Sequence, residues 1–177
     1  LISGGARLNV RNADGMTPLH IAADKGHVEI VALLIERGAW LNRRDADGYT
    51  ALHFAARQGH PEAARMLLEA GADTEAVDKY EATPLHVAAA NESIAVAKLL
   101  LRHGADPNAC DDQDGRPLHV AILFGNVETA GLLIRSGADL SARCENELTP
   151  LHVAAEKGRM ELARLLLECG VDINARA

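Results

Sequence analysis

The chain has 177 residues, of which 48% are hydrophobic but only 3% aromatic, and its formal net charge is −7. This acidic balance argues against non-specific nucleic-acid binding, and no apolar run approaches the roughly 20 residues needed to cross a bilayer. The first residues lack the basic and hydrophobic regions of a signal peptide, and the three cysteines form no CxxC pair. We therefore expect reduced thiols and an intracellular location, in the cytoplasm or the nucleus.

The first complete set of elements begins at Thr17. Its hydroxyl can cap a helix, and Pro18 suits the first helical position because its missing N–H would have no intrahelical partner there. A short helix is predicted over 19–25, ended by a glycine that tolerates positive φ. A second helix is predicted over 28–37 and carries a wide apolar stripe. The polar stretch 39–49 that follows predicts a projecting turn.

The same pattern returns every 33 residues. The Thr-Pro-Leu-His motif and its variants occupy residues 17–20, 50–53, 83–86, 116–119 and 149–152. The glycine after the second helix keeps the same step, at Gly38, Gly71, Gly104, Gly137 and Gly170. Two independent markers in phase predict stacked repeat units. Helices this short are marginal alone, so stability must come from packing between neighbouring units.

With the alanine pairs that follow the motif, the sequence closely resembles the ankyrin repeat. These pairs are Ala22-Ala23, Ala55-Ala56, Ala88-Ala89 and Ala154-Ala155, and the closing Gly-Ala-Asp-x-Asn-Ala pattern is fullest at 104–109. The resemblance covers essentially the whole chain as one domain, 1–177. It divides this domain into a partial repeat tail, 1–11, and five repeats, 12–44, 45–77, 78–110, 111–143 and 144–176.

The resemblance implies an all-α solenoid of stacked helix-turn-helix units with projecting β-turn or hairpin fingers. It also implies a concave face, made by the fingers and the first helices, that binds protein partners. The chain departs from the pattern at Glu81, Asp114 and Glu147 (finger turn), Glu92 (inter-helix turn), Arg116 (cap) and Ile122 (alanine pair). We expect the last three fingers to differ in backbone shape, because their turn glycine is replaced. Neither end has a polar capping unit, which we interpret as a segment of a longer array.

Partner contacts are expected at positions that the repeat framework leaves free, namely the fingers and the ends of the first helices. The candidates are Met16, Lys25, Arg44, Asp47, Tyr49, Arg57, Gln58, Lys79, Tyr80, Asn91, Asp112, Gln113, Leu123, Phe124, Arg143 and Leu148. The same positions also contribute Asp14, Asp24, Ala90, Asn146, Glu156 and Lys157.

Aromatic residues on successive units suggest a binding groove. Interface hot spots favour aromatic residues and arginine, so Tyr49, Tyr80 and Phe124, with Leu123, could line a groove across units 45–143. The alternative is that Tyr80 and Phe124 only pack against adjacent fingers. Trp40, where the resembled repeat has aspartate, is either a secondary contact or packs over a neighbouring loop, which we favour.

Metal, cofactor and catalytic sites are not predicted. Five of the eight histidines repeat at one position, where the imidazole can bond to the adjacent turn, and the chain has no HExxH, zinc spacing, GxGxxG, Walker loop or GxSxG elbow. Cys110 and Cys144 belong to different units, too far apart for a disulfide. The acidic finger 111–114 offers too few oxygens for calcium, so a basic partner or solvent is favoured. Asparagines that can be hydroxylated in similar repeats, and that by default hold their loops, are Asn9, Asn42, Asn108 and Asn174.

The leading interpretation is a non-catalytic interaction scaffold or adaptor that binds a protein or peptide on its concave and finger surface, monomeric in isolation. One rival is a sensor of small molecules or nucleotides, against which the acidic balance counts. Another is an enzyme, or the regulatory segment of a larger enzymatic protein. No cofactor, metal, specific nucleic acid or membrane insertion is expected.

Overall fold

A computed structural model describes residues 8–171 of the chain. Within them lie ten α-helices, one 3-10 turn (η1, Glu145–Glu147) and no β-strand. The helices are α1 (Pro18–Asp24), α2 (Val28–Glu36), α3 (Ala51–Gln58), α4 (Pro61–Glu69), α5 (Pro84–Ala90), α6 (Ile94–Arg102), α7 (Pro117–Phe124), α8 (Val127–Arg135), α9 (Pro150–Glu156) and α10 (Met160–Glu168). The predicted all-α solenoid is confirmed.

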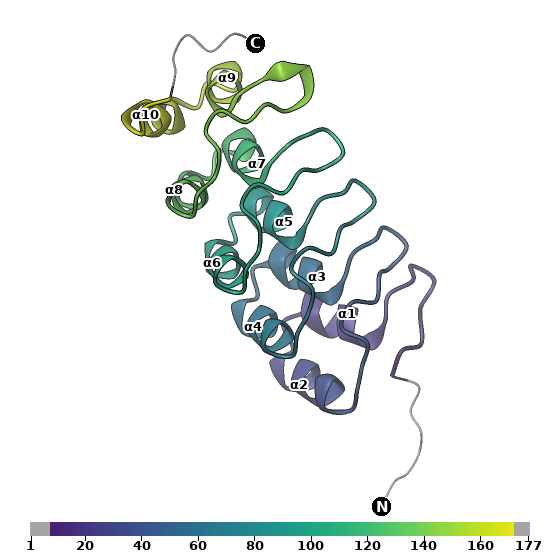
Figure 1. Cartoon of the computed structure of the whole chain (residues 1–177). Helices are drawn as coiled ribbons and strands as arrows, with labels where there is room; N and C mark the ends of the chain where they lie inside the picture. Colours follow the sequence, from purple (N-terminus) through teal and green to yellow (C-terminus); the bar gives the residue numbers. More distant parts are fainter. Residues whose placement is uncertain (1–7, 172–177) are drawn as a thin grey trace, which may run out of the picture.

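The helices stand in two parallel rows (Figure 1). The odd-numbered helices form the inner row, in which α1 contacts α3, α3 contacts α5, and so on to α9. The even-numbered helices form the outer row, with the same neighbour-to-neighbour contacts. Five loops, here called fingers 1 to 5 (12–16, 45–49, 78–82, 111–115 and 144–148), project beside the inner row (Figure 1).

The core runs as a continuous layer between the rows rather than as one central cluster. The inner helices α1, α3, α5 and α7 bury the leucine of the Thr-Pro-Leu-His motif at 1% exposure or less, whereas Leu151 of α9 is partly buried. Each outer helix buries a central leucine, and Leu67 and Leu100 have no exposed surface. The small alanines beside them, such as Ala55 and Ala88, are also fully buried, which lets neighbouring helices approach closely. Apolar contact between units therefore supplies the stability that these short helices lack.

Four of the five motif histidines join one unit to the next. The Thr17 backbone N–H donates to Nδ1 of His20, so the ring proton lies on Nε2, which donates to the Arg43 carbonyl at 2.8 Å. The same bridge to the following finger or its approach recurs in three further units. The Nε2 contacts are His53 to Ala82 (3.1 Å), His86 to Gly115 (3.2 Å) and His119 to Ala142 (3.2 Å). The predicted bond from the imidazole to the adjacent turn is confirmed in these units.

Fingers 1 to 4 share one turn held by an Asn or Asp side chain. In finger 2, Oδ1 of Asp45 accepts the backbone N–H groups of Asp47 and Tyr49. The equivalent acceptors are Asn12, Asp78 and Asp111. One backbone hydrogen bond of 2.8–3.0 Å also links each finger to the next, as from Ala46 N–H to the Asp14 carbonyl. The fingers are thus stacked turns. Within the described residues they contain no β-strand, so they are turns and not the hairpins that the resemblance gave as the alternative.

The expectation that the last three fingers differ in backbone shape is wrong for fingers 3 and 4. Glu81 and Asp114 adopt φ of 59° and 55°, in the same left-handed region as Gly48 at 88°. The Asx turn and the bond to the next finger hold them in a conformation that residues with a Cβ rarely adopt. Finger 5 does differ, because Cys144 replaces the Asn or Asp and Asn146 is left-handed as well as Glu147.

Replacing Leu100 by alanine should lower the free energy of unfolding by about 2–5 kcal/mol, because it leaves a cavity between α6 and its neighbours. Urea denaturation followed by circular dichroism measures the change. Leu33→Ala on α2 is the matched control: its side chain is 45% exposed, so we expect a much smaller loss. Equal losses for the two variants would contradict the described packing.

Candidate functional site

The sequence-predicted contact residues gather on the side of the molecule formed by the fingers and the inner-helix ends. Thirteen of the sixteen are exposed, and Met16, Tyr49 and Leu148 are partly buried. The fingers carry Asp47, Lys79, Tyr80, Asp112 and Gln113, the inner-helix ends carry Lys25, Arg57, Gln58, Asn91, Leu123 and Phe124, and Arg44 and Arg143 precede their fingers. The structure therefore brings these residues to one face but not to one site.

The N-terminal part of this face is a polar network around Asp24. Its carboxylate accepts hydrogen bonds from Gln58 (2.8 Å) and Arg57 (3.0 Å) and pairs with Lys25 (3.0 Å). Burial alone would raise the pKa of Asp24, but the hydrogen bonds from Gln58, Lys25 and Arg57 lower this pKa to about 2. Three predicted contact residues are thus engaged within the chain, and two of them, Arg57 and Gln58, tie α3 to α1.

Tyr49 and Arg44 also make contacts with other residues of the chain. The Tyr49 ring stacks on His53 at 5.2 Å and meets Phe54 edge-on, and the Arg57 guanidinium lies 4.7 Å from the Phe54 ring. Arg44 donates to the carbonyls of Gly48 and Asp78, both at 3.2 Å, so it links finger 2 to finger 3. Tyr49 fills the space between a finger and its inner helix.

Tyr80 and Phe124 are each 56% exposed. Tyr80 lies at the tip of finger 3, where the Lys79 ammonium stands 5.0 Å from its ring and pairs with Asp47 at 2.8 Å. Phe124 ends α7. With Tyr49, these aromatics occupy three different repeat positions rather than one row. Trp40 is 57% exposed, with the Arg43 guanidinium 5.5 Å from its ring.

A hollow of about 270 Å³ opens between the fourth and fifth units. Its apolar lining includes Gly115, Val120, Leu123, Leu148 and Val153, and its rim includes Asp111, Glu145, Glu156 and Lys157. In the second unit, the positions of the first three residues are held by Tyr49, Phe54 and Arg57, whose side chains pack on one another. In the fourth unit these positions carry no aromatic ring, and all three of their residues line the hollow. Aligning the repeats in the sequence reveals these replacements, which the predicted groove did not take into account.

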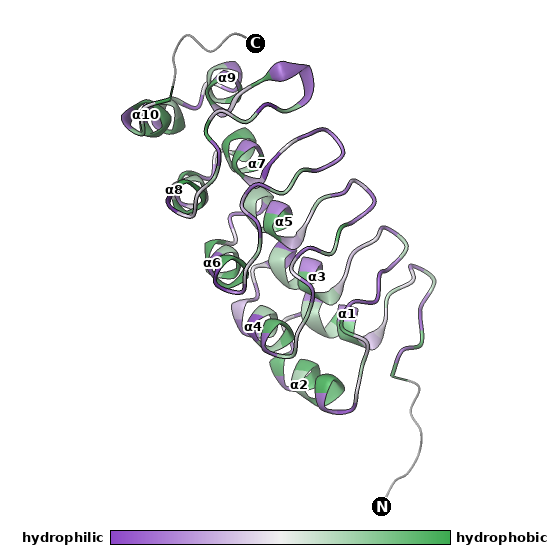
Figure 2. Ribbon diagram, in the orientation of Figure 1, coloured by the Kyte–Doolittle hydropathy of each residue, from purple (hydrophilic) through white to green (hydrophobic). Residues whose placement is uncertain are grey.

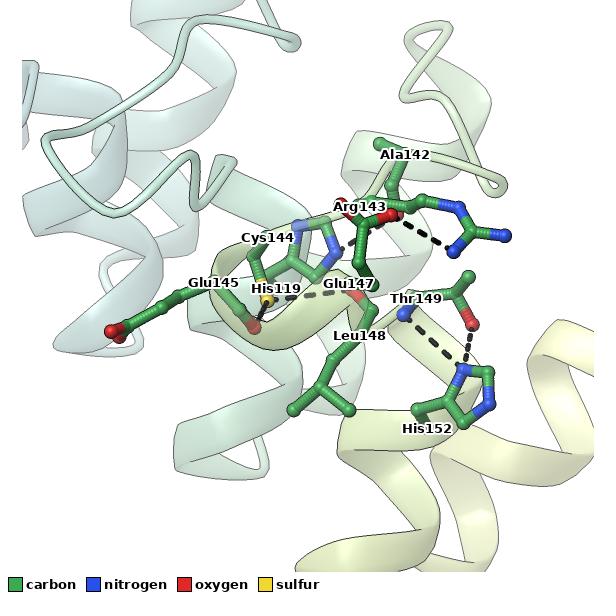
Figure 3. A network of polar contacts seen from close by, with 9 residues as sticks. All are labelled: His119, Ala142, Arg143, Cys144, Glu145, Glu147, Leu148, Thr149 and His152. Carbon is green, nitrogen blue, oxygen red and sulfur yellow. Dashed lines mark hydrogen bonds and ion pairs between the residues drawn. The ribbon is translucent and has the colours of Figure 1, made fainter. Parts of the chain in front are cut away.

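Finger 5 forms one wall of the hollow (Figure 3). Cys144 Sγ lies 3.4 Å from the Leu148 carbonyl, and Arg143 pairs with Glu147 at 3.0 Å. Burial raises the pKa of the Cys144 thiol, and the negative charges of Asp111 and Glu145 raise it further. In Figure 2 this finger is strongly hydrophilic, whereas α7 beside it is hydrophobic.

A comparison with protein-family models decides the family. The model for ankyrin repeats (three copies) matches residues 1–78, 42–111 and 85–177, which together span the chain. The chain belongs to the ankyrin repeat family. Ankyrin repeats are generally protein–protein interaction modules and are typically non-catalytic. No curated protein sequence matches the chain significantly.

Within residues 8–171 of this ankyrin array, no group of His, Cys, Asp or Glu side chains is arranged to hold a metal ion. No helix of the same residues is long and apolar enough to span a membrane. Asn9, Asn42 and Asn108 accept the backbone N–H groups of Trp40, Asp73 and Asp139, so they hold their loops as predicted. Asn174 lies outside the described residues.

Protonation of the framework histidines should destabilise the ankyrin stack in acid. Burial lowers the pKa of His20, His86 and His119, and it lowers that of His53 to about 4. Since the unfolded imidazole titrates near 6.5, its stabilising contribution is complete above that pH and is lost as the pH falls toward 4. Asp24, with its pKa lowered to about 2, loses its contribution only below about pH 4.

Between pH 7 and pH 5, His53 alone should cost about 2 kcal/mol of unfolding free energy, at about 1.4 kcal/mol per pKa unit. Urea denaturation at both pH values measures this difference. In His53→Gln, whose amide can replace part of the hydrogen bonding, the difference in unfolding free energy between pH 7 and pH 5 should be smaller by about 2 kcal/mol. His103→Gln, which removes an exposed imidazole, should keep the wild-type difference. A His53→Gln protein as acid-sensitive as wild type would contradict this assignment.

Proposed function

We propose that this ankyrin array is a non-catalytic scaffold or adaptor that binds a protein or peptide partner on its finger and inner-helix surface. The main support is the exposure of large apolar side chains at positions that the fold does not need. Tyr80 and Phe124 are each 56% exposed and Leu123 is 40% exposed, all on this face. Solvent-exposed aromatic groups of this kind are typical of interface hot spots.

A binding role fits the way the repeat divides its residues. The motif histidines bond to backbone carbonyls, so their rings hold neighbouring units together instead of facing a substrate. The threonine hydroxyls that lie 2.8–2.9 Å from four of these rings are buried in the framework, which favours recognition over chemistry. We further propose that the array acts as a monomer. Three free cysteines, two of them exposed, favour a reducing compartment such as the cytoplasm or nucleus.

A small-molecule or nucleotide sensor is the weaker candidate. The hollow between the fourth and fifth units, at about 270 Å³, is smaller than most small-molecule sites, which span roughly 300–1,000 Å³. Its rim holds three carboxylates against one lysine, which would repel phosphate groups. Both properties suit a single side chain of a protein partner better than a nucleotide.

Affinity purification with quantitative mass spectrometry tests the proposal. The test variant, Tyr80→Ala with Phe124→Ala, removes exposed rings and should leave the circular dichroism unchanged. Tyr49 stays intact, because its ring packs on His53. Proteins bound by the wild type should be recovered at least several-fold less with this variant.

The matched control is Lys98→Ala with Arg102→Ala, which truncates two exposed side chains on α6 in the outer row. It should retain the same proteins as the wild type. Equal recovery with the test and control variants would refute a binding surface centred on Tyr80 and Phe124.

A further inference from the structure

The hollow between the fourth and fifth units, at about 270 Å³, is large enough to take one apolar side chain. Val120 and Leu123 of α7 line one side, Leu148 and Val153 line the other, and Gly115 also belongs to the lining. Leu123 is 40% exposed at its edge, and Phe124 follows it on the surface. A leucine, methionine or phenylalanine side chain entering this space would bury its own apolar surface and that of the lining residues.

The charges around the hollow are mostly negative, because Asp111, Glu145 and Glu156 face a single lysine, Lys157, which pairs with Glu156 at 2.7 Å. Fingers 4 and 5 contain five carboxylates and no basic residue, at Asp111, Asp112, Asp114, Glu145 and Glu147. Finger 2, by contrast, has two carboxylates, one of them paired with Lys79. Fingers 4 and 5 therefore form the most acidic part of the finger row.

Several of these carboxylates remain available to a partner. Within residues 8–171, Asp112, Asp114 and Glu145 form neither an ion pair nor a side-chain hydrogen bond. Figure 3 shows the Glu145 carboxylate extended away from the other residues drawn. A basic partner would supply the missing counter-charges on fingers 4 and 5, whereas an acidic one would be repelled.

We propose that the hollow anchors one apolar side chain of an extended, basic peptide segment in a partner protein. The anchor is a leucine, methionine or phenylalanine, and lysine or arginine residues within about three positions of it pair with Asp112, Asp114 and Glu145. Side chains of an extended segment alternate in direction, so an anchor pointing into the hollow leaves its neighbours near the fingers. This inference rests on the proposed binding function and names the class of partner for that face.

Selection from a phage library of random 12-residue peptides on the immobilised 177-residue chain tests this inference. Enriched sequences should combine a large apolar residue with nearby lysine or arginine. Fluorescein-labelled synthetic copies then report dissociation constants by fluorescence anisotropy. Replacing the peptide's apolar residue by alanine should weaken binding about tenfold or more, and raising the salt from 50 to 300 mM should weaken it further.

Matched variants of the chain locate the site. Leu123→Arg should weaken the peptides at least tenfold, and it should fold, because Arg57 occupies the same repeat position in α3. Ala90→Arg adds the same charge at that position of α5 and should change the affinity less than threefold. Asp112→Asn with Glu145→Gln should weaken binding roughly threefold to tenfold and flatten its salt dependence. Glu29→Gln with Glu36→Gln, on the outer row, is the charge control and should leave binding unchanged.

Several outcomes would overturn the inference. They are the absence of enriched peptides, enriched peptides without basic residues, and binding that Leu123→Arg and Ala90→Arg affect equally. The proposed function is judged separately, by whether proteins recovered from extracts depend on Tyr80 and Phe124. Peptides that bind but are weakened by Arg57→Ala instead of Leu123→Arg would reject the hollow while keeping a binding function for the face.

Discussion

Contact between successive units is the interaction on which the rest of this molecule depends. Helices of seven to nine residues are too short to persist alone, and each is held by apolar contact with the helices before and after it. The motif histidine adds a polar contact in the same direction, from an inner helix to the next finger. Because a buried imidazole without its hydrogen bonds would be costly, this contact fixes the register of the stack as well as its stability.

The same constraint separates residues that build the array from those that can serve a partner. A position required for stacking stays apolar in every unit: the motif leucine is present in all five, and where Ile122 replaces an alanine of the pair it is also fully buried. A position facing solvent on the finger side is free to vary, and there the five units differ in size and charge. The position between a finger and its inner helix also varies, from the large Tyr49 ring packed on His53, through Ala82, to Gly115 in the lining of the hollow. Variation on a fixed scaffold is what allows one array to be specific.

Repeat phase was readable from sequence, because glycine and the Thr-Pro-Leu-His motif mark helix boundaries by local chemistry. The stacking and the histidine bridges followed from it and were predicted correctly. The backbone of fingers 3 and 4 was not, because an Asx turn keeps Glu81 and Asp114 left-handed where residue preference alone suggested another shape. The engagement of Arg57 and Tyr49 within the chain was also missed, since it depends on contacts between side chains of different units.

The two ends of the finger face therefore differ in how many of their polar groups are already bonded within the chain. Near the N-terminal units, Asp24 is satisfied by Arg57, Gln58 and Lys25, and a partner would have to displace those bonds before it could use the same groups. Near the C-terminal units, Glu147 pairs with Arg143, but the carboxylates of Asp112, Asp114 and Glu145 have no partner within residues 8–171 and belong to the fingers beside the hollow. A ligand gains more where it replaces water than where it competes with bonds already made inside the protein. Recognition on this face is accordingly favoured at its C-terminal end.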